Sequence, residues 1–458
     1  MDKLKLLQAR KQQLMDAGKN IRKEINELID KDSFVELSAF SFSKNDFYGE
    51  NAEGEGVVTG FATIDDYPFY IVAQNADVLS GGVSKANCEK IAKCLDQAEK
   101  NNSPVIYLLS SLGVQVGEGV NVLEGIAKLI LKASQLKGTV PQYLVVNGEV
   151  YGQIAVLAAI CDFTFFIDGK SVLAANSPLV ISAANGLNLK KEEVGGAKAL
   201  EKAQLASFTV SGLADVKVKI SALSSLLFEG VKDCDDLNST LPALNKKVDG
   251  SALLGIFDKG TAIELGATYA CAVKCVLGRI GGISVAAVIF DKEGGVSLSA
   301  SKIRKIKDFA EFASCYGLPY ITFVNTLGIC TCLEASNGLV LKEIGEYVNI
   351  LDCIDTAKIS VVYGKAIGLG YTLFAAKSMG YDFTYAFANA RIALFDSVQG
   401  AEIEFSDEKD IDKAKLAERY SEENSDPVNA AKGGYIDNII EPAFVKQYLI
   451  ASLQMLVK

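Results

Sequence analysis

The segment Lys358-Ile-Ser-Val-Val-Tyr-Gly364-Lys-Ala-Ile-Gly368-Leu-Gly370-Tyr371 decides the fold that the sequence predicts. Its pattern indicates a buried strand, a tight turn that needs glycine, and an apolar helix that runs to about Ser378. Backbone N–H groups at the start of a helix have no partner within it and point at whatever occupies the turn. Such groups can stabilise a negatively charged oxygen without using a side chain. The segment therefore predicts an oxyanion site.

The first half of the chain contains a second copy of this pattern. In Tyr143-Leu-Val-Val-Asn-Gly148-Glu-Val-Tyr-Gly152-Gln153-Ile154, an apolar run is again followed by a glycine, Gly152, which leads into apolar residues. Short motifs recur 215 or 216 residues apart: Ser111-Leu112-Gly113 with Thr326-Leu327-Gly328, Gly148 with Gly364, and Gly152 with Gly368. Matches in the same order and at nearly the same spacing indicate an internal duplication. We therefore predict two related halves, each with one oxyanion turn.

Apolar runs that alternate with helical patterns predict an α/β fold whose sheets are covered on both faces. Helices are expected at 2–30, 85–100, about 120–134, near 302–316 and in a closing segment through Leu456. The polar segment 230–250 is the candidate linker. We therefore divide the chain into an N-terminal domain, 1–235, and a C-terminal domain, 250–458. Residues 406–426 are expected to form a charged, mobile excursion.

Composition bounds the function. A chain of 458 residues that is 49% hydrophobic suggests two globular domains. Its net charge of −10 disfavours a general nucleic-acid or anionic-membrane surface. No apolar run approaches the roughly 20 residues that a membrane span needs, and the charged N-terminal segment is not typical of a signal peptide. We therefore expect a cytoplasmic protein with no nucleic-acid partner.

The chain contains no histidine. This excludes Ser-His-Asp and Cys-His nucleophiles, histidine-ligated metals and a histidine general base. An enzyme of this composition must use carboxylates, Tyr, Lys, backbone amides or the chemistry of a cofactor. The ten cysteines are scattered, as expected of reduced thiols. The close pairs Cys271/Cys275 and Cys330/Cys332 fit no zinc-ligand spacing, so we expect no metal site.

Further motifs are spread over nearly the full chain: Asp32-Ser-Phe-Val-Glu-Leu37, Gly54-Glu-Gly-Val-Val-Thr-Gly60, Glu89-Lys-Ile91, Gly117-Glu-Gly-Val120, Asp162-Phe163, Lys365-Ala366 and Gly434-Tyr-Ile-Asp437. With these motifs the chain resembles the carboxyltransferase (β) subunits of acyl-CoA carboxylases of the propionyl-CoA/methylmalonyl-CoA type. It is also similar to the α subunits of biotin-dependent acyl-CoA decarboxylases. The resemblance implies two tandem crotonase-like (ClpP/crotonase) domains, a homo-hexamer or other homo-oligomer, and active sites between the N-terminal domain of one subunit and the C-terminal domain of another.

The same resemblance implies the reaction. A carboxyl group would pass between carboxybiotin and the α carbon of a short acyl-CoA, and each oxyanion turn would stabilise one of the two oxygens that gain charge. One turn would hold the biotin ureido oxygen and the other the enolate oxygen of the coenzyme A thioester. The expected partners are a biotin carboxyl carrier protein with biotin carboxylase or membrane decarboxylase subunits. Biotin must come from another chain or domain, because this chain has no Met-Lys-Met biotinylation motif.

Site residues follow from the resemblance by position. The N-terminal oxyanion amides, on the acyl-CoA side, would belong to Gly152 and Gln153. The C-terminal amides, on the biotin side, would belong to Leu369 and Gly370. The expected cofactor-binding positions are Gly113, Gly148, Gly368 and Lys365.

The chain departs from the family pattern at these positions. Gly152-Gln153 replaces the usual glycine pair, and Gly368-Leu-Gly370 replaces Gly-Gly-Ala. The family's Asp-Ser-Gly-Gly-Ala-Arg stretch is Ser110-Ser-Leu-Gly-Val-Gln115, so an acid and an arginine are absent. A second hypothesis is therefore a catalytically silent, structural paralogue within a carboxylase or decarboxylase hetero-oligomer.

A third hypothesis is a biotin-independent crotonase-like hydratase or isomerase. It would use Glu118 or Glu149 as a general acid/base near the thioester. The alternative for Glu118 is a structural role near a helix start, where negative charge is favourable. The basic residues Lys19, Arg22 and Lys23 would contact coenzyme A phosphates or form a solvated helix face.

Overall fold

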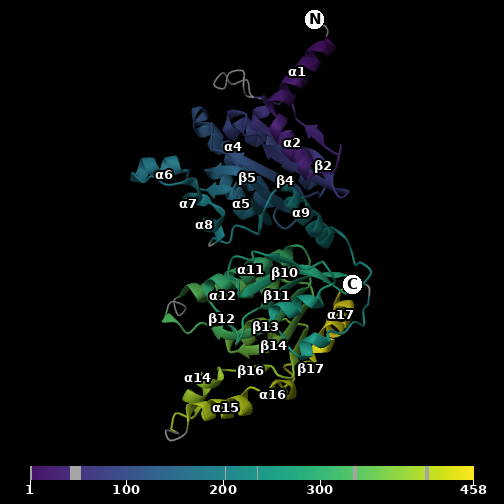
Figure 1. Ribbon diagram of the computed structural model, residues 1–458, viewed down its shortest axis with the longest axis vertical. Helices are drawn as coiled ribbons and strands as arrows, with labels where there is room; N and C mark the ends of the chain where they lie inside the picture. Colours follow the sequence, from purple (N-terminus) through teal and green to yellow (C-terminus); the bar gives the residue numbers. More distant parts are fainter. Residues whose placement is uncertain are drawn as a thin grey trace. The chain divides into compact units, whose positions relative to one another are not determined.

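The computed structural model describes residues 3–41, 53–201, 203–234, 236–333, 338–407 and 412–457. The chain divides into two compact units, Met1–Ser224 and Ser225–Lys458. Figure 1 shows that each unit is built on one β-sheet with helices beside it. This confirms the predicted α/β fold with two sheet domains. Residue 235, where the first predicted domain ends, lies outside the described residues.

In the described part of the N-terminal unit, eight strands form one sheet in the order β1-β2-β3-β4-β5-β6-β8, with β7 paired to β5. The first three strands pair in antiparallel fashion and the rest in parallel. The strands are β1 (Val35–Leu37), β2 (Val57–Ile64), β3 (Tyr67–Gln74), β4 (Val105–Ser111), β5 (Gln142–Tyr151), β6 (Phe163–Ile167), β7 (Val172–Ala174) and β8 (Phe208–Val210).

Helices cover both faces of this sheet because alternate side chains of its strands point to opposite faces and both sets are apolar. Leu144 joins a core cluster with Leu95 and Leu129, whereas the next residue back, Tyr143, stacks on Phe163. The helices are α1 (Lys3–Ala17), α2 (Lys19–Leu28), α3 (Lys85–Lys100), α4 (Val120–Leu136), α5 (Leu157–Ile160), α6 (Pro178–Asn185), α7 (Lys191–Gly195), α8 (Ala197–Glu201) and α9 (Leu213–Phe228), which contains the boundary between the units.

The described part of the C-terminal unit has nine strands in one sheet, in the order β17-β15-β14-β13-β11-β10-β9, with β12 on β13 and β16 on β14. The strands are β9 (Ile263–Leu265), β10 (Val273–Ile280), β11 (Ile283–Phe290), β12 (Val296–Leu298), β13 (Tyr320–Ile329), β14 (Lys358–Ile367), β15 (Phe383–Phe387), β16 (Arg391–Ala393) and β17 (Asn438–Ile440). This order repeats that of the N-terminal sheet, with β12 added.

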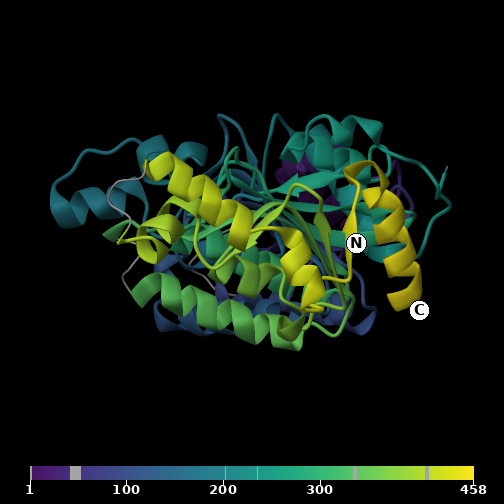
Figure 2. The ribbon, with the colours of Figure 1, turned by 90° about the horizontal axis from the view of Figure 1, so that it is seen from below.

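Helices α12 and α17 lie on opposite sides of the C-terminal sheet (Figures 1 and 2). Leu449 of α17 packs with Ile321 of β13, whereas Tyr347 of α12 meets the neighbouring residue Tyr320. The helices are α10 (Gly250–Leu253), α11 (Ala300–Cys315), α12 (Gly338–Cys353), α13 (Leu369–Phe374), α14 (Ser397–Glu404), α15 (Lys413–Asn424), α16 (Pro427–Lys432) and α17 (Val445–Leu456).

Matching hydrogen bonds support the duplication. Asp162 accepts from the N–H of Gln142 at 2.8 Å, and Asp382 accepts from the N–H of Lys358 at 2.8 Å. Each carboxylate thus fixes the start of its unit's central strand, β5 or β14. Chance similarity of sequence would not reproduce the same bond at the same place in two sheets.

Three predicted elements differ in extent. The helix predicted at 2–30 breaks at Gly18, where a side chain would collide with Arg22. The strand that begins at Lys358 continues through Gly364 to Ile367, and the following helix, α13, ends at Phe374 instead of about Ser378. Within the segment 406–426 the described residues form α15, which is anchored by a small apolar cluster with α14; residues 408–411 lie outside the described part.

Candidate active site

The central strand of each sheet is interrupted near its carboxyl end. In the N-terminal sheet, pairing of β4 with β5 runs to Leu109 opposite Val146 and resumes at Ser111 opposite Val150. Three residues of β5 therefore face a single residue, Ser110. A β-carbon placed on Gly148 would lie 2.6 Å from Ser110 Oγ, so any other residue there would displace the Ser110 hydroxyl. Such bulges bend a strand and redirect its last residues, and they are frequent beside active sites.

The strand β5 ends at a turn that we call the N-terminal turn, Gly152–Ile154. Gly152 has φ 81°, a conformation that glycine adopts without strain. Its N–H donates to the carbonyl of Ala174 in β7 at 3.2 Å. A 3₁₀ turn, Gln153–Val156, begins at the next residue and leads into α5. The first N–H groups of a helix have no intrahelical acceptor, so those of Gln153 and Ile154 face the space before it.

The predicted site residue Gly113 approaches this turn. It follows β4 with φ 130°, and its N–H donates to Ser111 Oγ at 3.3 Å. A β-carbon on Gly152 would lie 4.0 Å from Gly113 Cα. The structure therefore brings together Gly113, Gly148, Gly152 and Gln153 at the carboxyl ends of β4 and β5. This edge is where ligands bind in open α/β sheets.

The C-terminal turn, Gly368–Gly370, repeats the arrangement. Pairing of β13 with β14 lapses between Val324 and Thr326. Gly368 has φ 52°, and its N–H donates to the carbonyl of Ala393 in β16 at 2.9 Å. Helix α13 begins directly at Leu369. The N–H groups of Leu369 and Gly370 thus occupy the first helical turn, as those of Gln153 and Ile154 do.

Gly370 is held by its neighbours. A β-carbon on Gly370 would collide with the methyl group of Thr326 and would lie 3.4 Å from the N of Gly328. The N–H of Gly328 donates to Thr326 Oγ1 at 3.1 Å, which matches the bond between Gly113 and Ser111. Gly370 is buried, whereas Leu369 beside it is 41% exposed.

The repeat revises one site prediction. Gly152 and Gly368 stand at equivalent positions, and the N–H of each is committed to a carbonyl of the next short strand. Gly152 was predicted as an oxyanion donor, but in this structure its N–H bonds to Ala174. The equivalents of the predicted donors Leu369 and Gly370 are therefore Gln153 and Ile154.

Charged residues at equivalent positions beside the turns have opposite signs. Glu149 accepts from Lys191 Nζ at 2.8 Å and from the Tyr151 hydroxyl at 2.9 Å. The bond to Lys191 lowers the pKa of the Glu149 carboxyl. Lys365 stands at the matching place in β14 and donates to Asp396 at 2.7 Å. The predicted binding residue Lys365 is thus part of an ion pair beside Gly368.

A pocket of about 700 Å³ opens at the carboxyl ends of the N-terminal strands. That volume suits a small-molecule ligand. The lining mixes both charges and amides: Asn20, Ile21, Glu24, Gln74, Asn75, Ala76, Asp77, Ser80, Ser110, Leu112, Asn147, Gly148, Glu149, Gly169, Lys170 and Lys191. Lys170 donates to Glu24 at 3.1 Å and to Asn147 at 2.8 Å. Leu112, also in the lining, is 55% exposed.

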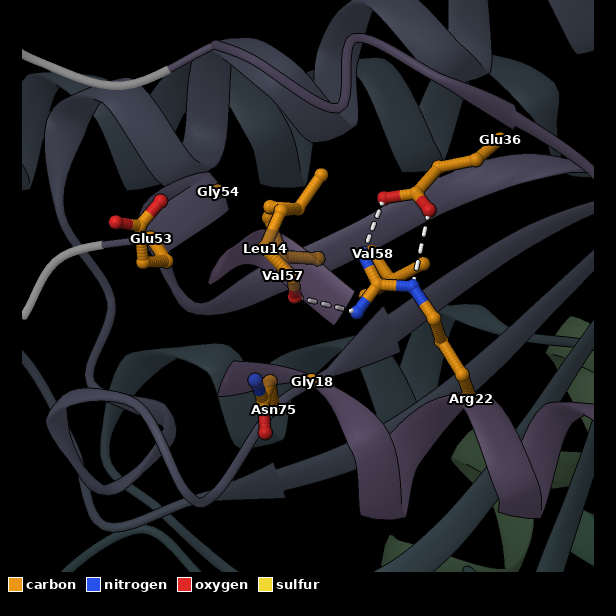
Figure 3. A pocket seen from close by; sticks show the side chains of 9 residues that line it. All are labelled: Leu14, Gly18, Arg22, Glu36, Glu53, Gly54, Val57, Val58 and Asn75. Atoms are coloured by element: carbon orange, nitrogen blue, oxygen red, sulfur yellow. Dashed lines mark hydrogen bonds and ion pairs between the residues drawn. The ribbon is translucent and has the colours of Figure 1, made fainter. Parts of the chain in front are cut away.

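Arg22 matches neither sequence-based alternative. Figure 3 shows its guanidinium aimed at Glu36, with which it makes bonds of 3.0 and 2.8 Å, and it also donates to the Leu14 carbonyl at 3.1 Å. It is 7% exposed. The adjoining pocket of about 10 Å³ is the size of one water molecule. Arg22 therefore joins helix to sheet and is neither a solvated residue nor a phosphate ligand.

Glu118 has a structural role. Its carboxylate accepts from the N–H of Lys85 at 2.7 Å, at the first residue of α3, and it is 8% exposed. A carboxylate there stabilises the helix start. This confirms the structural alternative for Glu118, which is not among the residues that line the pocket.

Several residues of the site were not identified from the sequence. The carbonyls of Ala174 and Ala393 fix the turn glycines, and the hydroxyls of Ser111 and Thr326 fix Gly113 and Gly328. The recurring Ser-x-Gly and Thr-x-Gly motifs could have identified the two hydroxyl residues, Ser111 and Thr326. No sequence pattern identifies Ala174 and Ala393, because every residue has a backbone carbonyl.

Two kinds of feature are missing from the described residues. Within those ranges no helix is long and apolar enough to cross a membrane. The same part of the chain contains no group of three or more His, Cys, Asp or Glu side chains placed to hold a metal ion.

Comparison with known proteins gives one consistent family. The model of the family "Carboxyl transferase domain" matches residues 13–458. The propionyl-CoA carboxylase carboxyltransferase subunit of Haloferax mediterranei is 28% identical over 96% of this chain and 91% of its own. The methylmalonyl-CoA decarboxylase α subunit of Veillonella parvula is 27% identical over 95% of this chain and 89% of its own.

Solved structures show the same fold. The transcarboxylase 12S crystal structure, a hexamer with methylmalonyl-coenzyme A bound, superposes with a TM-score of 0.91 at 24% identity, covering 99% of this chain and 95% of that one. The split strands, the paired glycine turns and a family match over nearly the full length lead to one conclusion. This chain is a member of the carboxyl transferase domain family.

Proposed function

We propose that this chain transfers a carboxyl group between carboxybiotin and the α carbon of a short acyl-CoA. The observation that carries the proposal is the duplicated turn, which supplies backbone N–H donors to two separate carbonyl oxygens in a chain without histidine. Carboxybiotin would supply the carboxyl group. The chain itself would bind and orient both reactants and stabilise the charge on their oxygens.

The N-terminal turn would serve the acyl-CoA. The N–H groups of Gln153 and Ile154 lie at the start of a helix that follows β5. Gly148, which lies earlier in β5, lines the 700 Å³ pocket together with Leu112. An enolate oxygen held there would be stabilised by donors that need no reorganisation during the reaction. Lys170 and Lys191 are the basic residues of the pocket and would be the first contacts for the phosphates of coenzyme A.

The C-terminal turn would serve biotin. Leu369 and Gly370 would donate to its ureido oxygen, with Gly368 and Lys365 beside them. Glycine at 370 lets the turn pack directly against Thr326. Biotin would be delivered by a separate carrier protein, and a hexamer like that of transcarboxylase 12S would be the working assembly, in the cytoplasm.

The hydratase alternative is disfavoured by the environment of its two acids. Glu118 is buried at a helix start. Glu149 accepts from Lys191 and from the Tyr151 hydroxyl, and the bond to Lys191 lowers the pKa of its carboxyl, which makes it a weaker base. A silent paralogue would have the same fold and no turnover. Only an activity measurement therefore distinguishes it from an active enzyme.

The test is decarboxylation of malonyl-CoA and methylmalonyl-CoA by the purified protein, with and without free biotin or biocytin. We expect turnover that depends on biotin. Turnover that is indifferent to biotin would overturn the proposal in favour of a hydratase-like enzyme. A folded oligomer with no turnover across a panel of acyl-CoAs would identify the silent paralogue.

A further inference from the structure

Cys330 and Cys332 form a close pair of thiols at the end of β13. Cys330 Sγ lies 2.8 Å from Cys332 Sγ, and the N–H of Cys332 points at Cys330 Sγ at 3.4 Å. No disulfide joins the two sulfurs. Cys332 is exposed and Cys330 is half-buried, so reagents in solvent reach the pair.

The other cysteines of the chain are placed differently. Burial raises the pKa of Cys88, Cys94 and Cys275 to about 12, which makes these thiols unreactive. Cys275 lies in β10 and is buried, whereas Cys271 is exposed and bonds to the Thr268 carbonyl. Proximity in the sequence therefore produces a thiol pair at 330 and 332 but not at 271 and 275.

A backbone N–H and an ammonium group act on the Cys330 sulfur. A backbone N–H stabilises negative charge on the sulfur to which it points. Lys302 interacts electrostatically with Cys330. Burial and the charge of Lys292 lower the pKa of the Lys302 ammonium, whereas Cys330 raises it. A cation that gains from a thiolate stabilises that thiolate in return.

We propose that Cys330 and Cys332 are a modification site, a dithiol that low-molecular-weight disulfides oxidise to an intrachain disulfide. The Cys330 thiolate attacks one sulfur of the small disulfide and releases one thiolate, which leaves a mixed disulfide on Cys330. Cys332 loses its proton and attacks Cys330 Sγ, which releases the second small thiol. The small disulfide is reduced to two thiols and the protein dithiol is oxidised, so atoms and electrons balance.

The site is connected to the C-terminal turn. Cys330 follows Gly328 by two residues, and its own N–H donates to the Leu298 carbonyl at 2.8 Å. A β-carbon on Gly328 would lie 2.8 Å from the Ile367 carbonyl and 4.0 Å from the N of Gly370. Closing the disulfide therefore acts on the strand end that packs against Gly370. The resulting fall in carboxyl transfer rests on the proposed function, whereas the thiol chemistry does not.

The experiment treats the full-length protein with glutathione disulfide and maps the products by mass spectrometry. The tryptic peptide 308–342 also carries Cys315, so fragment ions must assign the bond. We expect a 330–332 disulfide that forms about tenfold or more faster than any adduct on the exposed Cys353. Dithiothreitol should reverse it.

Two variants sharpen the result. Cys332→Ser should stop at a stable mixed disulfide on Cys330, because the second thiol is missing. Cys353→Ser is the matched control and should form the 330–332 disulfide at the wild-type rate. Persistent glutathione adducts in the wild-type protein, or reaction no faster than at Cys353, would overturn the proposal. Disulfide mapping in the wild-type protein needs neither a folded variant nor activity, so it decides the thiol chemistry even if carboxyl transfer is absent.

Discussion

The two turns fix their glycines in the same way but differ in the first turn of the adjoining helix. In the C-terminal turn the methyl group of Thr326 occupies the space where a side chain at 370 would lie. In the N-terminal turn the residue equivalent to Thr326 is Ser111, which has no such methyl group, and the residue equivalent to Gly370 is Ile154. One pair combines a larger partner with glycine and the other a smaller partner with isoleucine. The duplication thus preserved the backbone of the turn while the side chains at these two positions diverged.

The charges beside the turns differ as well. Glu149 lies beside the N-terminal turn and Lys365 beside the C-terminal turn, each paired with a residue of opposite charge. A common backbone therefore carries two electrostatic environments. This difference suits a protein in which the two sites bind different molecules.

The largest expected effect is on activity. Leu369→Pro removes one N–H at the first position of α13, where proline fits the helix geometry. We expect turnover to fall about 10²- to 10³-fold, the usual effect of losing one oxyanion donor. Gln153→Pro makes the equivalent change in the N-terminal turn. Steady-state decarboxylation measures both.

Leu369→Ala and Gln153→Ala keep the backbone donors and serve as the controls. If each alanine variant loses as much activity as its proline counterpart, the side chains and not the amides are responsible. If only one proline variant is impaired, the two turns do not share a function.

The second effect concerns buried lysines at equivalent places. Lys90 donates to the carbonyls of Gly54 and Val57 at 3.0 and 2.6 Å. Lys305 donates to those of Gly266, Tyr269 and Val273 at 2.8, 2.7 and 2.8 Å. We expect Lys90→Met and Lys305→Met to lower the free energy of unfolding by about 3 kcal/mol, because buried carbonyls lose their donor. Urea denaturation measures this, with the exposed Lys128→Met as control.

Lys90 also makes stability depend on pH. Burial lowers its pKa from 10.5 to about 8. Between these two values the unfolded chain binds more protons than the folded one, so the free energy of unfolding rises with pH. We therefore expect the free energy of unfolding of the wild-type protein, measured relative to that of Lys90→Met, to rise with pH between about 8 and 10.5. A difference between the two proteins that stays constant over the window would contradict the lowered pKa.

The third effect concerns the close contact between Gly370 and the methyl group of Thr326 at the C-terminal turn. Gly370→Ala should lower the free energy of unfolding by about 1–3 kcal/mol, because the new β-carbon meets Thr326. Thr326→Ser in the same chain should restore most of the loss by imitating Ser111. Gly345→Ala in α12 is the control, because nothing lies within 4 Å of its added carbon. Equal losses with and without Thr326→Ser would show that the methyl group is not the cause.

The smallest effect belongs to the ion pairs. The side chains of Lys365 and Asp396 are 31% and 26% exposed, and those of Lys191 and Glu149 are 46% and 32% exposed. Pairs this accessible contribute less than about 1 kcal/mol. Lys365→Met and Glu149→Gln should therefore shift the unfolding midpoint slightly. A large loss of activity in either variant with intact stability would assign that charge to substrate binding.

Much of the fold follows from local patterns. Apolar runs with punctuating glycines indicated β5 and β14, and helix α3 was predicted with its observed bounds, 85–100. Gly364 lies inside β14, where the pairing with β13 lapses, so it is not the glycine of the turn. The glycine that ends the strand is Gly368, as its positive φ shows.

The sequence by itself determined the α/β class, the duplication and the pair of glycine turns, because periodicity and the steric freedom of glycine act over a few residues. Tertiary structure alone decided which amides remain available. The N–H of Gly152 is occupied by Ala174 and that of Gly368 by Ala393, through short strands about 20 residues further along the chain. It also decided that Arg22 is buried against Glu36 and that Cys330 meets Cys332. Such pairings depend on distances between distant segments, which a linear pattern does not contain.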